Sequence, residues 1–221
     1  MGYHWDFGFL WGFRGLIWKG LLYSILYTVG TILLGLVIGL VTGLARLSRN
    51  RLVTLPIAAY VEAFRCTPLL VQLVWMYYAL PVITGIEIPA YLAAILALSL
   101  YVGSFYSEIF RGGVKSIESG QWDAARALGM TWVQVMRRVV LPQAVKRMTP
   151  PFINQSVIQL KNTSLVSTLA VADLMYQGTI ITAATYRPLE VYTLIAVLYF
   201  LILFPATWLA QVYEGRLAKS D

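Results

Sequence analysis

Charged residues, cysteine and histidine are scarce in this sequence. Asp, Glu, Lys and Arg make up only 12% of its 221 residues, whereas a typical soluble domain contains about 25%. The single cysteine, Cys66, excludes an internal disulfide framework and a cysteine-cluster metal site. The single histidine, His4, argues against a histidine-based metal or catalytic centre. We therefore expect no catalytic residues and no metal site in this chain.

Apolar residues are abundant instead, at 59% of the chain, and the mean hydropathy is +0.70. About 20 consecutive apolar residues cross a bilayer as one helix, and charged residues mark where such runs stop. The sequence predicts an all-α integral membrane protein with about five transmembrane helices, at 20–45, 57–80, 89–110, 152–172 and 190–212. The fourth of these helices carries Lys161 within it.

Tryptophan and phenylalanine are concentrated near the N-terminus, and such aromatic residues favour the membrane–water interface. We therefore interpret residues 1–18 as an interfacial segment. The transmembrane domain then covers 19–214, and residues 215–221 form a cytoplasmic tail.

The basic residues are unevenly distributed. Twelve of the 17 Lys and Arg residues fall in three places: the first connection, the segment 111–147 and the C-terminal tail. Basic residues are enriched in cytoplasmic loops of membrane proteins, so we read the net charge of +7 as an orientation signal rather than as a sign of nucleic acid binding. With five crossings, the N-terminus is expected outside and the C-terminus in the cytoplasm.

The long basic segment between the third and fourth spans has the signals of two short helices over about 119–139. Ser119 and Thr131 are suited to cap the two N-termini. Gly129 suits the left-handed position that ends a helix, and Leu141-Pro142 is expected to end the second helix. The pattern alone leaves two interpretations open: a docking surface for another protein, or an amphipathic linker at the membrane surface.

Seven residues of this segment form a motif of fixed spacing: Asp123, Ala124, Ala125, Gly129, Val139, Leu141 and Pro142. The motif resembles the EAA signature of the permease subunits of bacterial ATP-binding-cassette importers. That signature reads Glu-Ala-Ala, three residues, Gly, nine residues, Ile, any residue, Leu-Pro. The chain departs from it conservatively, with Asp in place of Glu and Val in place of Ile.

Three further segments, Tyr60–Gln72, Tyr106–Gly113 and Leu160–Leu165, resemble the polar amino-acid permeases, which include histidine, glutamine, glutamate, arginine and opine importers. The resemblance covers about 18–216. It implies a type I importer permease of the bacterial inner membrane that passes a polar L-amino acid, with the EAA-like segment docking a cytoplasmic ATPase.

The same resemblance implies several partners. These are a second permease subunit (in a homodimer or a related heterodimer), two ATPase subunits, a periplasmic or lipid-anchored amino-acid-binding protein, and membrane lipid. The chain has no phosphate-binding loop, so we expect no cofactor in it, with ATP and Mg bound by the ATPase. The alternative is an ion-coupled secondary amino-acid transporter, which would not explain the long cytoplasmic segment.

Polar residues inside the predicted spans are candidates for the substrate pathway, because lipid-facing placement of such groups is costly. The candidates are Arg65, Thr67, Gln72, Tyr106, Glu108, Lys161, Asn162, Thr163 and Ser164. Each has a structural alternative. Glu108 could pair with Arg111 one turn away and Arg65 with Glu62. The hydroxyls could bond to their own helix backbone, and Lys161 could extend to the membrane surface or bind a carbonyl.

Asn162 bears on the substrate class. Several members of the resembled group carry a carboxylate at this position, where it suits a cationic substrate group. The neutral amide here offers no such charge pairing. We therefore expect a neutral or acidic polar amino acid to be favoured over a cationic one.

Overall fold

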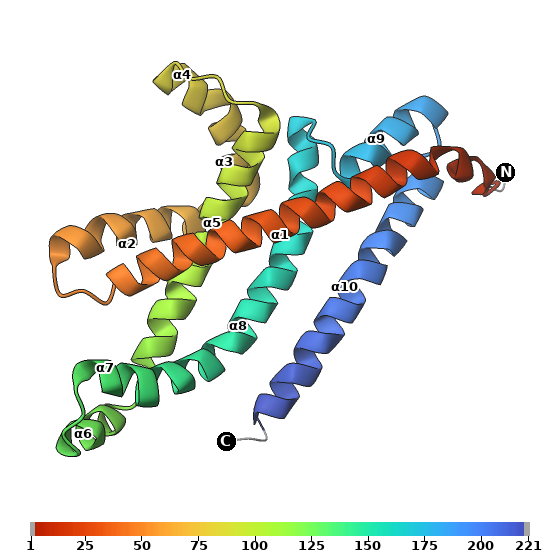
Figure 1. Cartoon of the computed structure of the whole chain (residues 1–221). Helices are drawn as coiled ribbons and strands as arrows, with labels where there is room; N and C mark the ends of the chain where they lie inside the picture. The colour runs from red at the N-terminus through yellow and green to blue at the C-terminus, as the bar shows by residue number, and fades with distance from the viewer. Residues whose placement is uncertain (1–2, 219–221) are drawn as a thin grey trace.

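The computed structural model describes residues 3–218, and these form helices without any strand, as the sequence predicts (Figure 1). Three helices are long and apolar enough to cross a membrane by themselves. They are α1 (Arg14–Ala45), which continues from the 3-10 helix η1 (Gly8–Phe13), α5 (Ala90–Lys115) and α10 (Pro188–Ala218). The α10 helix continues past the predicted boundary at 214, and residues 219–221 of the predicted tail lie outside the described residues.

The predicted second span is a bent pair of helices. Helix α2 (Arg51–Cys66) turns by 111° into a second arm, Leu69–Thr84. That arm consists of α3 (Leu69–Val74), the π-helix η2 (Trp75–Ala79) and α4 (Leu80–Thr84). The bend falls at Pro68, whose ring excludes a regular helical hydrogen bond.

The predicted fourth span is also bent, by 45°. Instead of one helix over 152–172, α8 (Leu141–Asn162) is followed by the 3-10 helix η4 (Thr163–Leu169) and then by α9 (Leu174–Thr185). The bend follows Ala170, whose φ of 56° is left-handed and therefore stops a right-handed helix. If each bent pair counts as one span, the described residues form five candidate spans.

Leu141-Pro142 does not end a helix, contrary to expectation. Pro142 lies in the first turn of α8, directly after a π-helical turn, and the chain stays helical through it. The π-helix η3 (Met136–Val140) joins α8 to the preceding α7 (Trp132–Val135). Helix α7 and α8 of the fourth span are therefore one continuous helical path.

Helix α1 packs along α5 through glycine. A Cβ added at Gly35 would lie 2.3 Å from Val102 Cγ1, and one at Gly39 would lie 2.4 Å from Tyr106 Cβ. The backbones of the two helices therefore approach more closely than any larger residue allows. Figure 1 shows α1 crossing both α5 and α8, and α1 packs on both of these helices.

A separate apolar cluster joins α6 (Ser119–Ala127) and α7 to the C-terminal end of α5 and the N-terminal end of α8. Its buried members include Val114, Ala125, Val135 and Ala144. Figure 1 places α6 and α7 at the same end of the molecule as the C-terminus, away from α4, α9 and the N-terminus. This cluster fixes the orientation of the EAA-like segment relative to the long helices.

Candidate functional site

The turn between α6 and α7 is built as the sequence predicts at two points. Gly129 has a φ of 70°, the left-handed conformation that favours glycine. Thr131 forms a capping box with Gln134: Thr131 Oγ1 accepts from the Gln134 N–H, and Gln134 Oε1 accepts from the Thr131 N–H at 2.8 Å. The predicted Ser119 cap is wrong, because Ser119 is already helical and Glu118 precedes it without a side-chain cap.

The EAA-like residues do not share one surface. Asp123, Ala124, Gly129, Leu141 and Pro142 are exposed. Ala125 is only 4% exposed and packs in the cluster beneath α6, while Val139 is half-buried against the same cluster. The Ala125 side chain therefore packs under α6 and does not contribute to its exposed surface.

Three apolar side chains that were not predicted as docking residues complete the outer surface of this segment. Leu128, Trp132 and Val133 are 81%, 67% and 64% exposed. Together with Asp123, Ala124 and Gly129 they form what we call the outer face of α6 and α7. Apolar side chains exposed in an otherwise polar segment are typical of a contact site. In the sequence, the apolar residues that follow Ala127 were the available signal for this surface.

Two predicted pathway residues on α5 are committed to other contacts. The Tyr106 side chain is fully buried, and its hydroxyl lies 2.7 Å from Ser156 Oγ on α8. Glu108 pairs with Arg111, as anticipated, and also accepts a hydrogen bond from Arg46 Nη1 at 2.6 Å. The Arg46 pairing was missed because 62 residues separate the partners in sequence.

The Gln72 side chain forms hydrogen bonds with free backbone carbonyls at the bend between α2 and α3. Its Nε2 donates to the carbonyls of Phe64, at 2.8 Å, and Thr67, at 2.9 Å. These carbonyls have no helical donor because the helix breaks at Pro68. Gln72 is therefore a structural group, and Thr67 contributes its backbone carbonyl to the same bend.

The polar residues that end α8 divide into two kinds. Thr163 Oγ1 and Ser164 Oγ donate to the carbonyls of Leu160 and Lys161, one turn back. These two hydroxyls therefore bond to the backbone of their own helix, as the structural alternative in the sequence analysis expects. Lys161 is exposed, whereas Asn162 is half-buried and its Nδ2 has no partner among the described residues.

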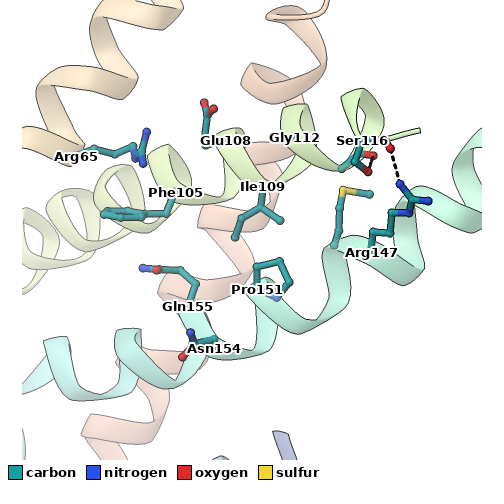
Figure 2. A pocket seen from close by; sticks show the side chains of 12 residues that line it. Arg65, Phe105, Glu108, Ile109, Gly112, Ser116, Arg147, Pro151, Asn154 and Gln155 are labelled. Carbon is teal, nitrogen blue, oxygen red and sulfur yellow. Dashed lines mark hydrogen bonds between the residues drawn. The ribbon is translucent and has the colours of Figure 1, made fainter. Parts of the chain in front are cut away.

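A cavity of about 480 Å³ lies between α2, α5 and α8. Two predicted pathway residues, Arg65 and Glu108, line it, together with Phe105, Arg147 and Gln155 (Figure 2). Arg147 donates to the backbone carbonyl of Ser116. The other predicted pathway residues lie outside this cavity, so the structure brings together only part of the predicted set.

The sequence matches, over residues 35–219, the family described as the inner membrane component of binding-protein-dependent transport systems. The glutamine permease GlnP of Escherichia coli is 36% identical, over 83% of this chain and 84% of that protein. The cystine permease TcyB of Bacillus subtilis is 36% identical, over 90% and 86%. The arginine permease ArtQ of the same organism is 32% identical, over 93% and 94%.

A solved structure, described as an amino acid ABC transporter with histidines, superimposes with a TM-score of 0.90 at 34% identity, covering 97% of this chain and 100% of that one. An inward-facing methionine ABC transporter, at 24% identity and a TM-score of 0.71, supports the same fold. These relatives do not favour the alternative of an ion-coupled transporter. The chain belongs to the binding-protein-dependent inner membrane permeases: it is a non-catalytic, multi-pass permease subunit of an amino-acid ABC importer with a type I fold, working with a second permease and a separate ATPase.

Proposed function

We propose that the chain forms the pathway for a polar L-amino acid that is neutral or acidic. The main support for this proposal is that no carboxylate lining the cavity is free to pair with a cationic substrate group. Of the charged residues that line it, Arg65, Glu108 and Arg147, the only acid is held by Arg46 and Arg111. Outside the cavity, Asn162 is a neutral amide at a predicted pathway position where a carboxylate would attract a cation. The relatives' names include glutamine, cystine and arginine, so they leave the substrate class undecided.

The test is ATP-driven uptake by the complete importer in vesicles. Unlabelled L-glutamine or L-glutamate should compete with labelled substrate, whereas L-arginine should compete at least about tenfold less well, because its cationic side chain gains no charge pair in the pathway. Asn162→Asp should shift the preference toward arginine. Asn50→Asp, at the exposed cap of α2, is the matched control and should not. Tight arginine uptake without competition from glutamine or glutamate would contradict the proposed substrate class.

We further propose that the outer face of α6 and α7 docks the ATPase, which binds ATP and Mg while this chain holds no cofactor. Leu128 and Trp132 would bury their exposed apolar surface in the contact. Movement of the ATPase would then act on α5 and α8 through the apolar cluster under α6. Rigid-body movement of packed helices is a common form of such switching.

Leu128→Ser tests this docking. It should lower co-purification of the ATPase with a tagged permease, and ATP-driven uptake, by at least about tenfold, because exposed apolar anchors dominate contact energies. The matched control is Val82→Ser in α4, where the side chain is 84% exposed at the other end of the molecule (Figure 1). Equal recovery of the ATPase with both variants would overturn the assignment.

The proposed orientation puts the N-terminus outside and the C-terminus in the cytoplasm. The two described chain ends lie at opposite ends of the molecule, and the C-terminus shares its end with α6 and α7 (Figure 1). In this orientation α4 and α9 face the periplasm, where a periplasmic or lipid-anchored binding protein would deliver the substrate. The exposed apolar sides of α1 and α10 would face membrane lipid or the second permease subunit, either an identical copy or a related one.

A further inference from the structure

We propose that the cavity between α2, α5 and α8 binds the carboxylate of the transported amino acid at Arg65, with the Gln155 amide donating to an oxygen of the same ligand. The inference rests on the proposed function and assigns a ligand group to a part of the pathway. The cavity volume of about 480 Å³ falls in the range of about 300–1,000 Å³ that is usual for small-molecule sites.

Arg65 supplies a cation whose hydrogen-bonding capacity is largely unused. Its nearest carboxylate is Glu62, at 4.0 Å, and the Glu62 side chain is itself 59% exposed. The guanidinium carbon lies 5.5 Å from the centre of the Phe105 ring. The ring offers no oxygen acceptor, so this contact leaves the N–H donors of Arg65 available to a ligand. A planar fork of N–H donors suits a carboxylate, which can accept two parallel hydrogen bonds.

Gln155 supplies a second, independent indication of a ligand. The residue is only 8% exposed, it lines the cavity, and its Nε2 has no acceptor among the described residues. A buried donor without a partner costs free energy, and a ligand oxygen would satisfy it. In Figure 2 the Phe105 ring lies between the Arg65 guanidinium and the Gln155 amide, so a ligand that contacts both groups must extend past the edge of that ring.

The remaining charges of the cavity do not compete for Arg65. Glu108 is bound by Arg46 and Arg111, neither of which lines the cavity, and Figure 2 shows its carboxylate directed away from Gln155. The Arg147 guanidinium donates to the Ser116 carbonyl. The cavity therefore carries an excess of positive charge, and its walls exclude part of the solvent that would screen an anion.

The experiment compares amino acids with their decarboxylated amines on the purified importer complex. The probes are L-glutamine with 4-aminobutanamide, L-histidine with histamine, and L-arginine with agmatine. Within each pair only the carboxylate differs, so its contribution is isolated. Arg65→Gln should weaken binding of the amino acid by at least about tenfold, the usual range for a lost charge-assisted hydrogen bond, and leave binding of the amine unchanged.

Two further variants keep the test independent of folding. Arg65→Lys retains the charge and should recover part of the lost affinity, whereas Arg51→Gln, at the exposed start of the same helix, should bind like the wild type. The proposal would be overturned if Arg65→Gln and Arg65→Lys lost the same affinity for the amino acid, or if one variant lost the same affinity for an amino acid and for its amine. It would also be overturned if none of the three amino acids bound to the wild type. If L-arginine is the best ligand and agmatine is unaffected by Arg65→Gln, the carboxylate site stands and the proposed substrate class fails.

Discussion

Helices α1 and α10 are both long, apolar candidates for membrane spans, yet they are held in the fold in different ways. The buried residues of α1 are all small: Gly20, Ser24, Thr28, Thr31, Gly35, Gly39 and Gly43. They recur every three or four positions and form one continuous stripe against α5, α8 and α9. The buried residues among the described side chains of α10 are Glu190, Val191, Ile195 and Ala210. Because α1 and α10 are similarly apolar, hydropathy does not separate them. The stripe of small residues is what marks α1 as the helix that packs on its neighbours along its length.

The first turns of α10 are joined to the rest of the chain by polar contacts. The Tyr3 hydroxyl donates to Glu190 Oε2 at 2.6 Å, and Arg187 pairs with the same carboxylate at 3.1 Å. Further along, the Tyr199 hydroxyl donates to Asp173 Oδ2 at 3.3 Å. Beyond these contacts, large side chains such as Phe200 and Phe204 are exposed. These polar contacts thus anchor the start of α10, which also packs on α8, while large apolar side chains along it stay exposed.

The largest expected effect comes from filling the small-residue stripe of α1. Gly39→Leu should destabilise the permease by about 3 kcal/mol or more, because even a Cβ at this position lies 2.4 Å from Tyr106 Cβ and 3.0 Å from the Ser107 N. The two helices would have to separate, since backbone cannot move aside as a flexible side chain does. Thermal unfolding of the purified protein in detergent measures the change.

Gly30→Leu is the matched control on the same helix. A Cβ at Gly30 meets nothing within 4 Å, and replacing a helical glycine removes a cost of roughly 0.5–1 kcal/mol. We expect this variant to be as stable as the wild type or slightly more stable. If Gly30→Leu and Gly39→Leu were equally destabilised, close packing would not be what separates α1 from α10.

The sequence predicts the helices that depend on local signals and misses what depends on distant contacts. The apolar runs predicted helices in the regions of α1, α5 and α10, and Gly129 and Thr131 predicted the turn between α6 and α7, because each of these acts within a few residues. The second span bends at Pro68, where Gln72 bonds two freed carbonyls, and the fourth bends after Ala170, whose left-handed backbone no sequence pattern indicated.

The candidate site was less predictable for the same physical reason. Polar residues in apolar spans predicted Arg65 and Glu108 at the cavity, but Arg46 lies 62 residues from its partner Glu108. The motif around Ala125 marked the segment proposed for docking without showing which of its residues point inward. That choice depends on the packing of α6 against Val135 and Val140, which no local pattern contains.

The smallest expected effect concerns the exposed apolar surface of α10. Phe200 is 59% exposed, with its ring stacked on Phe204 at 5.2 Å, so Phe200→Ala should change the free energy of unfolding by less than about 1 kcal/mol. Ile195→Ala on the same helix is the comparison. Ile195 is 5% exposed and fills the space beside Gly178, so its loss should cost about 2–5 kcal/mol. If thermal unfolding showed Phe200→Ala to be as destabilising as Ile195→Ala, the surface of α10 would be a buried contact with the second permease subunit. Helices α1 and α10 would then both be packed along their length, and they would differ only in the partner they pack against.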